Sequence, residues 1–291
     1  MKYRLLFLNI CILFLHISCE EELQVPLPDE EPKLVINSLL GVDSLLRVHV
    51  SKSSGFQMEN TNSPLANADV KISQNNQLLG NMIHESNGWY SLNSKVLTAN
   101  SSYQIEVSHP DLETAKSETE ALEKVTISNL NYQVKEENKI EFTIQFQDKP
   151  LQKNYYMILL KAIDGSTIST INYYSDDIIF NGNLTENSIG IQQNMLRGSR
   201  TFSDENLDGN NISISIYVYN ELFDNSDLFQ EYKIELYHIT SDYFKYERSI
   251  TSYYERDDLP FFNKINLHSN VSDGYGIFTT YAIDSKTINN E

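Results

Sequence analysis

Apolar and polar residues alternate with a period of two along much of this 291-residue chain. The clearest stretch is residues 103–107, Tyr-Gln-Ile-Glu-Val, and residues 212–218 repeat the pattern with aliphatic side chains. Successive side chains of a strand point to opposite faces, so both stretches predict strands with one buried face. Turn signals such as Asn87-Gly88 recur about every ten residues, which is typical of β-sandwiches. We therefore expect a mainly β protein.

One segment has the period of a helix instead. Its apolar and aromatic residues recur at spacings of three and four, which predicts an amphipathic helix near residues 241–255. The residues of this stripe are Tyr243, Tyr246, Ile250, Tyr253 and Tyr254. We interpret the stripe as a face that packs on the sheet.

The first residues predict export and lipid attachment. A short positive start precedes an apolar run at residues 5–17, which has the length of an export signal and is shorter than the roughly 20 residues of a membrane-spanning helix. Ser18 and Cys19 then match a lipoprotein cleavage site, where the Cys19 thiol would receive the diacylglycerol group. The other cysteine, Cys11, lies inside the leader, so lipidation best explains Cys19. An ordinary secretory signal is the alternative, and His16 departs from the usual leucine.

Acidic residues set the charge of the chain, which is −18 at pH 7. This excludes nucleic-acid binding, which needs a basic surface. It also disfavours adsorption to anionic headgroups, so acyl chains such as palmitate would attach the protein to the membrane. Residues 19–32 hold three prolines and six acidic residues, and they predict an acidic tether. Glu20-Glu21-Glu22 resembles the surface-export signal of Bacteroidota lipoproteins, and a plain soluble linker is the alternative.

These patterns predict four parts of the chain. They are a lipoprotein signal peptide at residues 1–18, the tether at 19–32, a β-sandwich domain at 33–118, and a second β-rich domain at 124–285 that carries the helix. The first domain resembles small immunoglobulin-like or prealbumin-like sandwiches in its Ala68-x-Val70 and Gly88-x-Tyr90 pairs. We interpret Trp89 and Tyr90 as packing residues rather than as a platform for a ligand.

Readable catalytic motifs are absent from the sequence. It contains no His-Glu-x-x-His, no Gly-x-Ser-x-Gly and no phosphate-binding loop, and its histidines are scattered. One metal candidate remains. Asp204, Asn206 and Asp208, followed by Gly209, match the first half of a calcium-binding EF-hand loop, although Ser215 stands where a bidentate glutamate is needed. A polar hairpin turn is the favoured interpretation, and we expect no other cofactor or metal.

Tyrosines are the other candidate for binding. Tyr217 and Tyr219 fall on one face of the strand predicted at residues 212–218, and tyrosine is common on binding surfaces. Tyrosine is also favoured in strands, so packing is the simpler interpretation.

Several stretches together resemble one family. They are Cys19-Glu-Glu-Glu, Pro32-Lys-Leu-Val-Ile-Asn, the Ala68-x-Val70 and Gly88-x-Tyr90 pairs, Phe202-Ser-Asp and the closing Ser269-Asn-Val-x-x-Gly-x-Gly-Ile-Phe. The chain is similar to the Bacteroidota outer-membrane lipoproteins grouped as domain-of-unknown-function 4249. Ser272-Asp273 stands where this family often has another glycine. The resemblance implies an outer-membrane lipoprotein encoded beside TonB-dependent receptors, and it supplies no catalytic residues.

We therefore expect a non-enzymatic outer-membrane lipoprotein that binds a ligand or partner as an accessory of a TonB-dependent receptor in nutrient uptake. The tether slightly favours the cell-surface face over the periplasmic face. Two alternatives are a surface-exposed hydrolase of glycans or peptides and a structural or adhesive surface lipoprotein. A hydrolase would bring two carboxylates, or a histidine and a nucleophile, together in a cleft.

Overall fold

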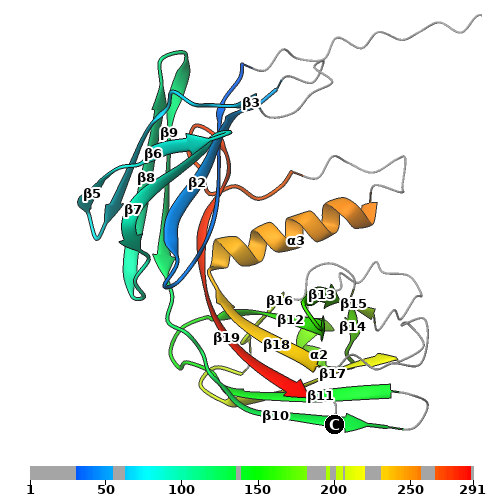
Figure 1. Ribbon diagram of the computed structural model, residues 1–291. Helices are drawn as coiled ribbons and strands as arrows, with labels where there is room; N and C mark the ends of the chain where they lie inside the picture. Colours follow the sequence, from blue (N-terminus) through cyan, green and yellow to red (C-terminus); the bar gives the residue numbers. More distant parts are fainter. Residues whose placement is uncertain are drawn as a thin grey trace, which may run out of the picture.

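The computed structural model describes residues 31–54, 63–135, 139–181, 195–196, 201–205, 207–219, 231–256 and 266–289. Within these ranges the chain is mainly β, as the alternating sequence predicts, and its strands form three sheets (Figure 1). The predicted signal peptide and the tether up to residue 30 lie outside the described residues.

The largest sheet extends through the whole molecule. Its path runs β13 (Thr167–Ile171), β12 (Tyr155–Asp164), β18 (Glu231–Ile239), β19 (Tyr275–Asn289), β1 (Leu34–Gly41), β2 (Leu45–Lys52), β7 (Trp89–Val96) and β6 (Ile83–Ser86), with β16 (Thr201–Ser203) on β12 and β3 (Ser63–Pro64) on β2. The second sheet is β10 (Ile127–Val134), β11 (Lys139–Gln147), β17 (Asn211–Tyr219), β14 (Tyr173–Tyr174) and β15 (Met195–Leu196). The third is β5 (Gln77–Asn81), β4 (Asp69–Gln74), β8 (Ser101–His109) and β9 (Leu112–Ala121).

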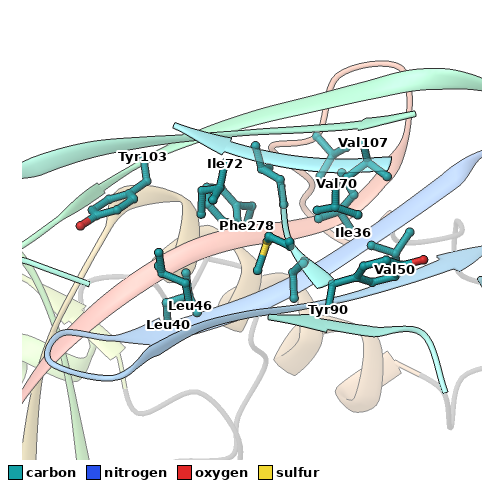
Figure 2. Close-up of a cluster of buried hydrophobic side chains, with 14 of the residues drawn as sticks. Ile36, Leu40, Leu46, Val50, Val70, Ile72, Tyr90, Tyr103, Val107 and Phe278 are labelled. Atoms are coloured by element: carbon teal, nitrogen blue, oxygen red, sulfur yellow. The ribbon is translucent and has the colours of Figure 1, made fainter. Parts of the chain in front are cut away.

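The third sheet packs on one end of the largest sheet and forms the first sandwich. Figure 2 shows Ile36 and Val50, from β1 and β2, in one cluster with Ile72 and Val107, from β4 and β8. Each of these four side chains is buried, and burying one such aliphatic side chain contributes roughly 1.5–3 kcal/mol. Tyr90 is buried in the same core, which confirms its interpretation as a packing residue.

The second sheet packs on the other end and forms the second sandwich. Ile144 and Ile216, from β11 and β17, are fully buried or nearly so in one cluster with Ile158 and Leu236, from β12 and β18. The outward residues of β11 and β17 alternate with these core residues, as the period of two predicts. The outer face of this sheet carries Tyr174, Tyr217 and Tyr219.

Strand β19 joins the two sandwiches. Its first half pairs in parallel with β1, from Val35 with Tyr275 to Gly41 with Tyr281, and its second half pairs antiparallel with β18. Phe278 therefore packs in the first core (Figure 2), and Ile288 packs against the second core. The strand that closes the predicted second domain thus also completes the first core.

A helix, α3 (Ser241–Arg256), lies where the tyrosine spacing predicts one, and a short helix, α2 (Ile178–Asn181), follows β14. The Thr240 hydroxyl accepts a hydrogen bond from the Tyr243 amide at 3.1 Å and so caps the first turn of α3. Tyr243 is buried against Met157 and Ile239 of the largest sheet. Further along the predicted stripe, Tyr246 and Ile250 are half-buried and Tyr253 is 46% exposed, so burial decreases along these residues of the stripe.

A buried glutamate on β18 gives the second sandwich a measurable pH dependence. Glu235 is 2% exposed, and its carboxylate lies 2.7 Å from Lys161 Nζ and 3.0 Å from Lys233 Nζ. Burial raises the pKa of Glu235, but the hydrogen bonds from Lys161, Lys233 and Tyr237 outweigh it and hold the pKa below its usual value. The unfolded chain therefore binds this proton more readily, and the stabilisation is lost as the pH falls through the folded pKa.

We predict that Glu235→Gln lowers the free energy of unfolding by about 1–2 kcal/mol at pH 7, because a charge-assisted contact becomes neutral. Urea unfolding at pH 7 and at pH 3.5 measures the difference, which should shrink at the lower pH. The matched control is Glu205→Gln, because Glu205 is exposed and lies 3.7 Å from Lys153. An equal loss in both variants would contradict the prediction.

Candidate functional site

The predicted lipidation residue, Cys19, lies outside the described residues. The described ranges contain no helix that is long and apolar enough to cross a membrane. Lipidation of Cys19 therefore stays a prediction of the sequence.

Two of the candidate calcium residues lie in a small carboxylate cluster. Asp204 and Asp208 contribute to it, Asn206 lies outside the described residues, and the third member is Asp148, which follows β11. One carboxylate oxygen from each aspartate lies within 4.8 Å of the others. Asp148 and Asp204 are buried and Asp208 is exposed. Asp148 has no signal of its own in the sequence, because it comes from a different loop.

Hydrogen bonds tie this cluster to the loops around it. Asp148 accepts the Tyr156 hydroxyl at 2.5 Å on Oδ1 and the Gly209 amide at 2.8 Å on Oδ2. Asp204 Oδ2 accepts the Asn154 amide at 2.9 Å. Burial raises the pKa of Asp204, the bond from Asn154 opposes this, and the Asp148 charge raises it further. The cluster thus holds two loops together through buried acceptors.

Calcium prefers six to eight oxygen ligands, and the three aspartates offer carboxylate oxygens at one place. Four of the contacts around them are with backbone amides or a hydroxyl of the protein itself. The described contacts therefore give the cluster a structural role, and calcium binding remains the untested alternative to the polar turn.

His238 connects the cluster with the segment that links the two sandwiches. It is buried, with Nδ1 2.7 Å from the Glu123 carbonyl oxygen and Nε2 3.1 Å from Asn154 Oδ1. Burial lowers the pKa of this histidine. Within the described ranges no histidine joins the carboxylates as a metal-ligating group.

A group of tyrosines covers the outer face of the five-stranded sheet. Tyr217 and Tyr219 make an edge-to-face contact with centroids 5.7 Å apart, so they share one face as the alternation predicts. Tyr174 of β14 stacks on Tyr217, with centroids 5.6 Å apart and an angle of 14°. The sequence pattern does not reveal Tyr174, because β14 is only two residues long.

A hollow of about 500 Å³ lies beside these rings, and we call it the tyrosine hollow. It is lined by Lys139 and Glu141 of β11, Ser215 and Tyr217 of β17, and Asp176 and Asp177 after β14. These residues come from three elements, which the strand pairing brings together: Glu141 lies opposite Tyr217, and Tyr174 pairs with Tyr217 from the other side.

Each carboxylate of the tyrosine hollow has a defined contact. Lys135 donates to Glu141 at 2.7 Å, and this hydrogen bond is the main reason that the pKa of Glu141 lies below its usual value. The Tyr217 hydroxyl donates to Asp176 at 3.3 Å. The Ser215 amide donates to Asp177 at 3.2 Å. The hollow is therefore formed and acidic.

A second hollow, of about 540 Å³, lies on the outer face of the four-stranded sheet. Its charged residues are Lys71, Glu106, Lys116 and Glu118, and Glu106 pairs with Lys116 at 2.8 Å and with Lys71 at 3.8 Å. Its lining contains no aromatic ring among the described residues. Its two lysines balance its two glutamates, so this hollow shows less preference for a ligand of one charge than the tyrosine hollow does.

Comparison with protein families identifies the family of this chain. The model of the family described as "Domain of unknown function (DUF4249)" matches residues 20–287. No curated protein matches the chain. Among solved structures, the crystal structure of bovine butyrophilin aligns at 7% identity over 71% of this chain and 92% of that chain, with a TM-score of 0.21, too low to support any inference. Because the family match covers nearly the whole sequence, the chain belongs to the DUF4249 family.

Proposed function

We propose that this protein is a non-enzymatic outer-membrane lipoprotein, anchored through Cys19, that binds a ligand or partner as an accessory of a TonB-dependent receptor. The observation that carries the binding role is the tyrosine hollow. Its volume of about 500 Å³ falls in the range of small-molecule sites. The Tyr217 ring supplies contact area, and the charged groups beside it supply the specific polar contacts that such a site needs.

The same geometry favours binding over hydrolysis. A glycan hydrolase pairs an ionised carboxylate with a carboxylic acid whose pKa is raised, so that the acid can donate its proton. In the tyrosine hollow the pKa of Glu141 is lowered by Lys135, and Asp176 and Asp177 accept hydrogen bonds. The contact with Lys135 keeps Glu141 ionised, so Glu141 is a poor proton donor. This supports a site that attracts a ligand without reacting with it.

The anchor gives a direct prediction. Cys19→Ser should move the protein from the membrane fraction to the soluble fraction, because the acyl chains have no thiol to attach to. Fractionation and mass spectrometry of the mature N-terminus measure the change. Cys11→Ser is the matched control, since Cys11 lies within the predicted leader and its loss should leave the protein acylated. Retention of the Cys19 variant in the membrane would contradict the anchor.

The partner is tested separately. Affinity isolation of the lipidated protein from detergent-solubilised membranes should recover a β-barrel receptor, and deletion of the protein should reduce uptake by that receptor. Protease added to intact cells should cleave the protein if the acidic tether directs it to the surface. If no receptor is recovered and uptake is unchanged, the accessory role fails, and binding to cells or matrix would favour the adhesive alternative.

A further inference from the structure

Lys139 places an ammonium group inside the tyrosine hollow. Its Nζ lies 3.6 Å from the centroid of the Tyr217 ring. A cation within about 6 Å of a tyrosine ring is attracted by the negative face of the ring. Glu141 takes its close ion pair from Lys135 instead, at 2.7 Å. The ring face of Tyr217 is thus a position that accepts an ammonium group.

The surrounding charge favours cations as well. One lysine and three carboxylates line the hollow, so it is acidic even with Lys139 in place. The net charge of the whole chain is −18, which raises the local concentration of cations near such a surface. The stacked Tyr174 and the edge-on Tyr219 hold Tyr217 in a fixed orientation. The charge and the ring therefore favour the same class of ligand.

We infer that the tyrosine hollow binds a small organic cation with a primary ammonium group, which displaces Lys139 from the Tyr217 ring and lies near Asp176 and Asp177. This inference rests on the proposed binding function and names its ligand class. The hollow has space for a short aliphatic stem in addition to the ammonium group. An ammonium group gains from both the ring face and the carboxylates, whereas a neutral ligand gains only from the ring.

Calorimetry on the full-length lipidated protein in detergent tests the ligand class with two probes of similar length. Putrescine carries primary ammonium groups, and 1,4-butanediol replaces them with hydroxyls. We expect putrescine to bind at least about tenfold more tightly, because the ring face and the carboxylates both favour an ammonium group over a hydroxyl. The affinity should also fall as sodium chloride rises, since the carboxylates are screened.

Single substitutions measure separately how the Tyr217 ring, the Asp177 charge and the competing Lys139 contribute to putrescine binding. Lys139→Met should tighten putrescine binding by about three- to tenfold, because the tethered competitor is removed. Tyr217→Phe keeps the ring face and should stay within about threefold, whereas Tyr217→Leu should lose about tenfold. Asp177→Asn keeps an acceptor for the Ser215 amide and should weaken binding by about threefold or more. Circular dichroism confirms that each variant folds.

Lys33→Met is the matched control for Lys139→Met. Lys33 also places its Nζ over a tyrosine ring, 5.7 Å from the Tyr275 centroid, but in the first sandwich. Its loss changes the net charge equally and should leave putrescine binding unchanged.

Weaker binding by Lys139→Met, or equal binding of the two probes, would overturn the inference. Binding of a neutral sugar without putrescine would also overturn it while the proposed binding function stands. Putrescine binding without any recovered receptor would support the inference and remove the accessory role.

Discussion

Replacing Gly276 with alanine is expected to lower the free energy of unfolding by about 3–5 kcal/mol, which is among the largest effects of a single substitution. Gly276 has a φ of +103°, a conformation that residues with a Cβ rarely adopt. A Cβ at this position would lie 2.1 Å from the Ile36 carbonyl oxygen and 2.9 Å from Asn37 Oδ1. Strand β1 would have to move away from β19, and this parallel pairing joins the two sandwiches.

Gly165→Ala is the matched control. Gly165 has a φ of +54°, and a Cβ built there would meet no atom within 4 Å. Gly165→Ala should therefore lower the free energy of unfolding only by the cost of the left-handed backbone, about 1 kcal/mol. Urea unfolding followed by circular dichroism compares the two variants. Similar losses in both would show that close approach to β1 does not determine the effect at Gly276.

The sequence predicts the strands well and their partners poorly. Alternation shows which face of a strand is buried, as in Ile212 to Val218, because that property is local. It does not show that Gly276 lies beside Ile36, because strands from opposite ends of the chain meet only through packing of the whole fold. The resemblance to the family includes both glycines of the closing segment, Gly274 and Gly276. The need for glycine at position 276 follows only from the structure, in which the β1 backbone lies against it.

The candidate sites, too, could be predicted from the sequence only in part. Asp204 and Asp208 are recognisable because they lie in one loop, and Tyr217 and Tyr219 because they lie on one strand. Asp148 joins the aspartates from another loop, and Asp176 joins the tyrosines from a segment after β14. Neither residue has a periodic pattern around it. Parts of a site that share one element could be predicted, and parts assembled from several elements could not.

Asp148→Ala is expected to lower the free energy of unfolding by about 3–4 kcal/mol, because two hydrogen-bonding groups lose their acceptor in a buried place. These groups are the Tyr156 hydroxyl and the Gly209 amide, and Asp148 itself is 1% exposed. Asp208→Ala should cost about 1 kcal/mol, since Asp208 is exposed and loses one bond, from the Leu151 amide. Thermal unfolding with a chelator present ranks the two variants. An equal effect of both would contradict a structural role centred on Asp148.

Asp148→Asn separates this structural role from calcium binding. Asparagine keeps an oxygen for the Gly209 amide, can donate its amide to the Tyr156 oxygen, and removes a negative charge from beside Asp204, whose pKa that charge raises. If the cluster is structural, the free energy of unfolding of Asp148→Asn should therefore fall by only about 1 kcal/mol, with or without calcium. A calcium site would behave differently, because repulsion among the aspartates would be balanced by the ion. Calcium would then raise the unfolding temperature of the wild type, and Asp148→Asn would lose that increase.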